Sequence, residues 1–97
     1  MVQVTVDKDL EDLIPGFLTN RQRDIEKVEA LLAKGDFDGI RIIGHSMKGS
    51  GGGYGFPFIT EIGAGLERAA IARDADIIRN ATSQLRHYLA QVEIVYR

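Results

Sequence analysis

The sequence contains no cysteine and no tryptophan, and only two of its 97 residues are proline. Without cysteine, the chain cannot build a disulfide scaffold, a thiolate metal site or thiol redox chemistry. The formal net charge is only −2, so no basic field indicates binding to nucleic acid or to an anionic membrane. What remains is the composition of an ordinary globular protein, 44% hydrophobic and 27% charged.

Long apolar runs are absent as well. No stretch approaches the roughly 18 consecutive apolar residues of a membrane-spanning helix. The first seven residues lack the charged-then-apolar order of a signal peptide. A chain of 97 residues can bury one modest core. We therefore expect a single domain over 1–97 that works in the cytoplasm.

The spacing of the apolar residues predicts an all-α protein. Residues 2–6 alternate like a strand, but no second alternating run exists to pair with them, so residues 1–7 are expected to be an extended lead-in. Apolar steps of three and four residues predict a short helix over 8–14 and bundle helices over 15–34, 37–54, 57–73 and 75–96. Short turns make consecutive helices antiparallel, which predicts an up-down four-helix bundle with a short extra N-terminal helix.

Glycine is concentrated in one stretch, where it supplies six of the twelve residues from Gly44 to Gly55. The stretch is either a loop that cradles a ligand or a helix face without side chains. A dinucleotide-binding G-x-G-x-x-G pattern starting at Gly49 would need glycine where Tyr54 stands, and no strand leads into it. A phosphate-binding loop places its lysine after the glycines, whereas Lys48 precedes them. We therefore favour the helix.

On this helix, His45 is expected to face solvent. Ile40, Ile43, Met47 and Tyr54 fall on one stripe with the helical period, and His45 points to the opposite side. A lone exposed histidine is usually an ordinary surface residue, so evidence for a function has to come from the residues around it.

The helix surface beside His45 is poor in side chains. Gly49 and Gly52 follow on the same face. A helical glycine costs ~1 kcal/mol relative to alanine, so Gly49 and Gly51–Gly53 together cost roughly 4 kcal/mol. A bare backbone beside an exposed imidazole would let another macromolecule approach it closely.

The residue types around His45 indicate phosphoryl chemistry. A neutral imidazole has one free nitrogen that can act as a nucleophile. Lys48, one turn on, supplies a positive charge that can attract a phosphoryl group. The sequence has no motif for ATP and no carboxylate cluster for Mg²⁺. The phosphoryl group is therefore expected to come from a partner that brings its own metal, and we expect no autokinase activity.

His45, with Lys48 at +3, Gly49 at +4 and Gly55 at +10, resembles the motif of the histidine-containing phosphotransfer (Hpt) domain family. Residues 66–70 are similar to the segment of that family's next helix that packs beside the active histidine, and the likeness spans nearly the whole chain. The resemblance implies a monomeric bundle that relays phosphoryl groups between aspartates of receiver domains in a multistep His–Asp phosphorelay. Implied partners are a response-regulator receiver domain and a hybrid sensor histidine kinase.

The same resemblance implies the roles of the site residues. His45 is the phosphoacceptor through Nε2, Lys48 assists and Gly49 clears space. No cofactor is implied beyond the phosphohistidine itself, and the Mg²⁺ belongs to the partner receiver. The protein is thus a phosphocarrier intermediate and not an enzyme in its own right.

Further candidate binding residues surround the histidine: Arg41, Ile42, Leu13, Ser46, Gly52 and Glu67. Ile42 and Leu13 are candidates for an apolar docking patch, although single exposed apolar residues are common. Ser46 either hydrogen bonds to the phosphoryl group or is a small packing residue. Glu67 either contacts the His45 region from the next helix or is a solvated charge.

One alternative function is a non-catalytic adaptor of the same fold that binds a receiver or kinase. The presence of both His45 and Lys48 argues against it. A phosphorylated domain excised from a larger chemotaxis-type kinase is a third possibility. His87 serves as an internal comparison, because it is followed by Ala90 and Gln91 at +3 and +4 and is expected to be a plain surface residue.

Overall fold

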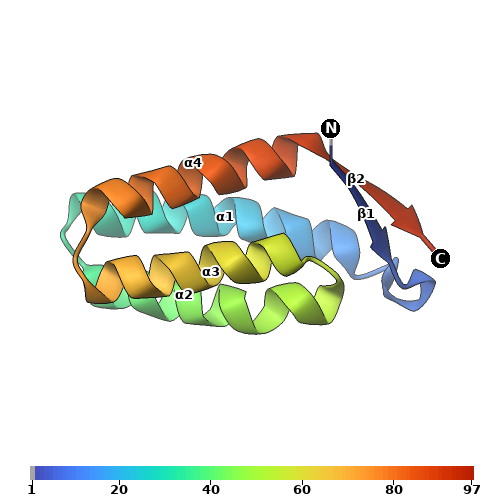
Figure 1. Ribbon diagram of the computed structural model, residues 1–97, viewed down its shortest axis with the longest axis horizontal. Helices are drawn as coiled ribbons and strands as arrows, with labels where there is room; N and C mark the ends of the chain where they lie inside the picture. Colours follow the sequence, from blue (N-terminus) through green and yellow to red (C-terminus); the bar gives the residue numbers. More distant parts are fainter. Residues whose placement is uncertain (1) are drawn as a thin grey trace.

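The computed structural model describes residues 2–97 and leaves out Met1, where the expected lead-in begins. The elements along the chain are β1 (Val2–Val6), a 3-10 turn (Lys8–Leu10), α1 (Ile14–Ala33), α2 (Phe37–Gly51), a second 3-10 turn (Gly52–Tyr54), α3 (Pro57–Ile71), α4 (Ala75–Gln91) and β2 (Val92–Tyr96). The four helices confirm the predicted bundle (Figure 1).

The helices begin at residues whose side chains suit a helix start. Asp36 accepts a hydrogen bond from the backbone N–H of Gly39 at 2.9 Å and caps α2, as its position before the apolar stripe predicts. Asp74 caps α4 in the same way through the N–H of Ile77, at 3.1 Å. Proline occupies the first turn of both α1 and α3, where its missing N–H costs little.

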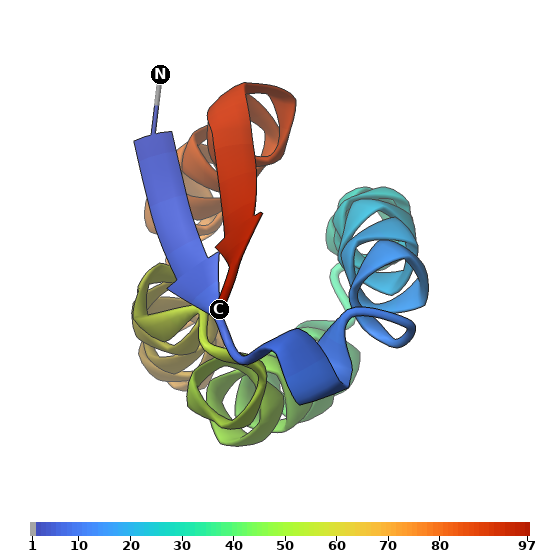
Figure 2. The same ribbon diagram turned by 90° about the vertical axis from the view of Figure 1, so that its right-hand side faces the viewer.

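Consecutive helices run antiparallel, and all four surround one core. Figure 2 shows α1, α2, α3 and α4 following one another around the bundle. The fully buried side chains come from every helix and include Ile14, Ile40, Met47, Ile59 and Leu85. Of the four stripe residues predicted for the helix over 37–54, Ile40 and Met47 are buried and Ile43 and Tyr54 are partly buried, which confirms the stripe.

The expectation that the protein has no sheet is wrong. β1 pairs in parallel with β2, with Val2 opposite Val92 and Val6 opposite Tyr96. Val92 continues the apolar steps that predict a helix over 75–96, but its backbone is extended, with φ −69° and ψ 131°. The β-branched and aromatic residues of this segment favour a strand once a partner is in reach. The folded bundle provides that partner, because it brings both chain ends to one end of the molecule (Figure 1).

The predicted helix over 8–14 is also wrong. Only one 3-10 turn forms, at Lys8–Leu10, with Asp7 accepting a hydrogen bond from the N–H of Asp9 at 2.9 Å. This segment has few apolar residues to bury, and a short helix without tertiary packing is unstable. The predicted end of the second bundle helix at residue 54 is likewise late, since its last three residues form a 3-10 turn.

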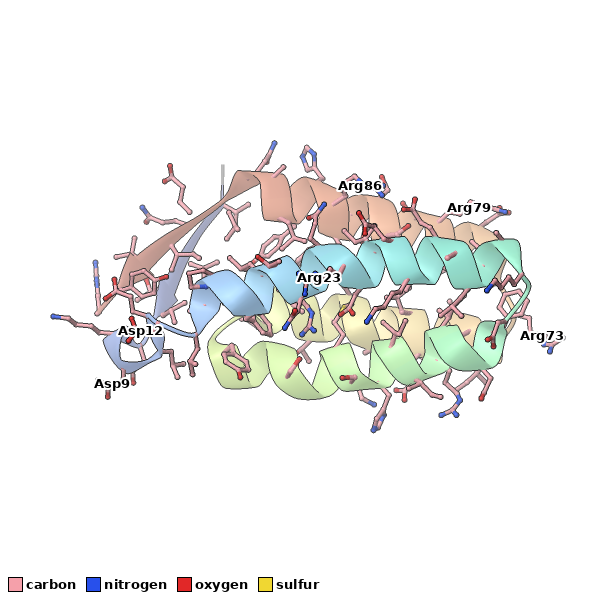
Figure 3. The ribbon with its side chains drawn as sticks, turned by 180° about the vertical axis from the view of Figure 1, so that it is seen from behind. Asp9, Asp12, Arg23, Arg73, Arg79 and Arg86 are labelled. Carbon is pink, nitrogen blue, oxygen red and sulfur yellow. The ribbon has the colours of Figure 1, made fainter. Side chains whose placement is uncertain are left out.

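Most charged side chains lie on the outside of the bundle. Seen from behind, Arg23 projects from α1 and Arg79 and Arg86 project from α4 (Figure 3). Arg86 donates to Glu29 of α1 at 2.9 Å, which links the outer surfaces of the two helices. Within residues 2–97, no helix combines the length and the apolar character needed to cross a membrane.

Candidate functional site

His45 lies in the middle of α2 and faces solvent. Its side chain is 68% exposed, as the helical phase predicted. The core residues Ile40 and Met47 on the same helix point the other way, because they are buried. The imidazole is therefore accessible to another protein without any movement of the bundle.

A carboxylate from α3 holds one nitrogen of the ring. Glu67 Oε2 lies 2.7 Å from His45 Nδ1, and the Glu67 side chain is only 17% exposed. An ionised carboxylate can only accept a hydrogen bond, so Nδ1 carries the proton. In the neutral form of the ring, the lone pair is then on Nε2. Of the two interpretations of Glu67 left open by the sequence, the contact with the histidine is the one observed.

Glu67 also binds Lys48. Its other oxygen, Oε1, lies 2.6 Å from Lys48 Nζ. The hydrogen bond from Lys48, followed by that from His45, lowers the pKa of the Glu67 carboxyl below its usual value of 4.5. One ionised carboxylate thus joins the two residues that the Hpt-like motif places three positions apart.

Two glycines allow α2 and α3 to approach closely enough for these contacts. A Cβ on Gly44 would lie 2.7 Å from the backbone N of Glu67 and 2.8 Å from the carbonyl oxygen of Gly63. A Cβ on Gly63 would collide with the backbone N of Lys48. Since backbone atoms cannot easily move aside, any larger residue would push the helices apart. The Gly44–Gly63 crossing therefore sets the distance between His45 and Glu67.

The glycines after Lys48 do not all form a bare face. A Cβ on Gly51 would lie 2.5 Å from the backbone N of Thr60, so Gly51 faces α3 and not solvent. Gly49 does fit the expectation, because a Cβ there would meet no described atom within 4 Å. Gly52 is exposed, and its N–H donates to Thr60 Oγ1 at 2.7 Å. The expectation of a bare surface thus holds for Gly49 and Gly52 but not for Gly51.

Thr60 ends the regular hydrogen bonding of α2. Its hydroxyl accepts from Gly52 N–H and donates to the carbonyl oxygen of Lys48 at 3.1 Å. These are the two groups that an uninterrupted α-helix would join directly. The inserted hydroxyl explains why the chain changes to a 3-10 turn at Gly52.

The other candidate residues spread over the surface around His45. Arg41 forms an ion pair with Asp38 of its own helix at 2.9 Å and is not brought to the histidine by any hydrogen bond of the described residues. Ile42 is 55% exposed. Ser46 is exposed and lines a groove of about 420 Å³ between α1 and α2, which Leu13 lines from the other side. The groove mixes apolar residues such as Leu13 with polar ones such as Asn20, so an apolar docking patch beside His45 stays a prediction.

Arg21 forms the floor of this groove. Arg21 falls within the apolar stripe of the first long helix, and a charged residue there is expected to extend its guanidinium to water, but the side chain is only 13% exposed. The guanidinium lies 4.9 Å from the centre of the Phe17 ring, donates to Ser50 Oγ at 3.1 Å and pairs with Asp24 at 2.9 Å. Ser50 thus has a structural contact with α1. Burial raises the pKa of the Asp24 carboxyl, and the nearby Arg21 charge opposes that shift.

The sequence model of the Hpt domain family matches residues 12–94. The chain belongs to the Hpt domain family. Comparison with curated proteins and with solved structures gave no match. Membership assigns this Hpt domain to His–Asp phosphorelay signalling, in which Hpt domains act with receiver domains and histidine kinases as phosphocarriers. Residues 2–97 hold no group of three or more His, Cys, Asp or Glu side chains arranged to bind a metal ion.

Sequence reasoning did not find the roles of Gly44 and Thr60 in this Hpt domain. Gly44 carried a usable signal, because it falls between Ile40 and Met47 on the core-facing stripe of α2. A glycine inside an apolar stripe indicates close backbone approach. Thr60 carried no such signal, because its partners on α2 become neighbours only in the folded bundle.

Proposed function

We propose that this Hpt domain is a phosphocarrier that accepts a phosphoryl group from the aspartyl phosphate of one receiver domain and passes it to the aspartate of another. The relay would begin at a hybrid sensor histidine kinase. The observation that carries the proposal is the exposed His45 ring, whose Nδ1 lies 2.7 Å from a carboxylate that also binds Lys48. This arrangement leaves Nε2 as the accessible nucleophile.

In the accepting step, the Nε2 lone pair attacks the phosphorus of the aspartyl phosphate. The N–P bond forms while the P–O bond to the aspartate breaks, and the aspartate leaves as a carboxylate. The ring keeps its Nδ1 proton and gains a positive charge, which the Glu67 carboxylate stabilises. In the return step, the aspartate of the second receiver attacks the phosphorus and the N–P bond breaks.

Lys48 is proposed to bind the phosphoryl oxygens. Its side chain is about two-fifths exposed, so Nζ can turn from Glu67 toward a group bound to His45 Nε2. Gly49 leaves the space beside the ring open to the receiver. We expect the Mg²⁺ that assists transfer to be held by the receiver's own carboxylates.

The test is transfer of labelled phosphate from purified phosphorylated receiver domains to the full chain. Wild type is expected to acquire an acid-labile, base-stable label, and His45→Gln is expected to acquire none. His87→Gln is the matched control, because it removes the other histidine and should label like wild type. Equal labelling of the His45→Gln variant would refute the proposal. A stable complex with receivers but no transfer would favour the adaptor function instead.

A further inference from the structure

A second groove lies on another part of the molecule, between β1, the start of α3 and the last turns of α4. Its volume is about 610 Å³. The floor contains Phe58 and Tyr88, whose ring centres are 4.5 Å apart, and the rim carries Gln84, His87 and Gln91. It shares no lining residue with the surface around His45.

One wall of this groove is a strand with an open edge. β1 pairs with β2 on one side only. Val6 accepts a hydrogen bond from Arg97 N–H, and Lys8 N–H donates back to Arg97, so the backbone groups of the even-numbered residues face β2. Because these directions alternate along a strand, the N–H and C=O groups of Gln3 and Thr5 point to the open edge.

This edge lacks the features that usually keep a strand edge from pairing. Natural edges are commonly blocked by charged residues, proline or a bulge. β1 reads Val-Gln-Val-Thr-Val and has none of these, whereas β2 carries Glu93. Among residues 2–97, those that line the groove include no Asp, Glu, Lys or Arg. The groove is therefore suited to an uncharged occupant with a backbone that can pair.

We propose that the groove binds an extended, uncharged peptide segment of a partner protein, which adds to β1 as a third strand. Its backbone would exchange hydrogen bonds with Gln3 and Thr5, and alternate apolar side chains would pack on Phe58 and Tyr88. β1 has five residues, so about five residues of the peptide, roughly 17 Å, would be in contact. A charged side chain on the inward face would lose its hydration without gaining a partner.

The binding is separate from phosphotransfer. A peptide in this groove and a receiver domain at His45 would occupy different surfaces of the same bundle. The inference therefore does not depend on the proposed function, and each can fail without the other.

The probe is an acetylated, amidated peptide of alternating valine and threonine, seven residues long, titrated into the full ¹⁵N-labelled chain. Binding is expected to shift the amide signals of Gln3 and Thr5 and to slow their hydrogen exchange. A peptide with every second amide N-methylated, in each of the two possible phases, cannot donate on one edge. We expect one phase to bind and the other to fail. Equal binding of both phases, or no shift with the unmodified peptide, would overturn the proposal.

Thr5→Pro tests the open edge directly. It removes an N–H that points away from β2, so the β1–β2 pairing is expected to survive. Affinity for the peptide should fall about tenfold or more, from the lost hydrogen bond and the proline ring in the path of the incoming strand. Thr5→Val keeps the N–H and is the matched control, with affinity near that of wild type. Unchanged affinity in Thr5→Pro would show that the strand edge is not used.

Gln84→Glu tests whether the site prefers an uncharged occupant. It places a charge at the rim of the groove and should weaken peptide binding severalfold, while an unchanged affinity would contradict an uncharged site. Sedimentation of wild type and Thr5→Pro tests self-association. A wild-type dimer that Thr5→Pro converts to monomer would mean that the occupant is a second copy of the chain, and the proposal would be wrong.

Discussion

The two sides of the bundle are held together in different ways. At the contact between α2 and α3, backbone meets backbone, since Gly44, Gly51 and Gly63 each face the other helix with no room for a Cβ. At the contact between α1 and α4, the helices meet through side chains such as Val28 and Ile78, and a cavity of about 410 Å³ opens between them.

The difference follows from what each contact has to hold. His45, Lys48 and Glu67 are joined by hydrogen bonds of 2.6–2.7 Å, so a small increase in helix separation would break them. Glycine contacts fix the helix separation, because backbone atoms cannot rotate away from a close contact as a side chain can. The α1–α4 contact holds no such network and can tolerate a looser fit. Four substitutions, each with a control or a second measurement, test this difference in order of decreasing expected effect.

Gly63→Ala should have the largest effect. The new Cβ would collide with the backbone of Lys48, and relief requires α2 and α3 to separate. We expect a loss of about 2–3 kcal/mol in the free energy of unfolding, as for overpacked cores, together with slower phosphotransfer. Chemical denaturation and transfer kinetics measure the two effects.

Gly65→Ala is the matched control on the same helix. A Cβ at Gly65 would meet no described atom within 4 Å. Replacing a helical glycine by alanine at such a site should stabilise the protein by up to about 1 kcal/mol. Equal destabilisation by the two substitutions would mean that the close approach of α2 and α3 is not what Gly63 provides.

Under the proposed function, Glu67→Gln should reduce transfer by about tenfold, because the amide lacks the charge that would stabilise the phosphorylated ring. The ¹⁵N shifts of the His45 ring report the tautomer directly, and the fraction protonated at Nδ1 should fall. A merely structural role for Glu67 would leave those shifts unchanged.

The same variant tests the pH dependence of stability. The folded-state pKa of Glu67 lies below its usual value of 4.5, so the stability that the ionised carboxylate adds to the fold is fully present above pH 4.5. The contribution is lost as the pH falls through the lowered value. The difference in unfolding free energy between wild type and Glu67→Gln should therefore shrink on acidification. A difference that grows at low pH would contradict this assignment.

Thr60→Val should destabilise the protein by about 1–2 kcal/mol, because Gly52 N–H and the Lys48 carbonyl lose their shared hydroxyl. Thr60→Ser keeps the hydroxyl and should recover most of the loss. If valine costs nothing, the two backbone groups have simply rejoined as a regular helical bond.

Arg86→Gln, on the looser side, should have the smallest effect. The ion pair with Glu29 is about half exposed at both partners. Such pairs contribute about 0–1 kcal/mol and are screened by salt. Thermal unfolding at low and high ionic strength should show a change near zero. A loss as large as that of Gly63→Ala would remove the distinction between the two contacts.

Much of the fold and the placement of the candidate site were predictable from sequence because they rest on local patterns. The helical period placed His45 opposite Ile40 and Met47, and motif spacing singled out Lys48 and Gly49. The caps at Asp36 and Asp74 act within three residues of chain. The reliance on local patterns also explains why the last helix was predicted to continue past Val92. The short apolar segment that begins there satisfies both the helical and the strand pattern.

The bundle, the exposed histidine and the family could therefore be inferred from the order of residues alone. Three other results appear only in the folded chain: β1 pairs with β2, Glu67 reaches both His45 and Lys48, and Gly51 faces Thr60 and not solvent. These three results depend on distances between segments far apart in the chain. Such distances are set by how closely helices pack, which no local spacing of residues records.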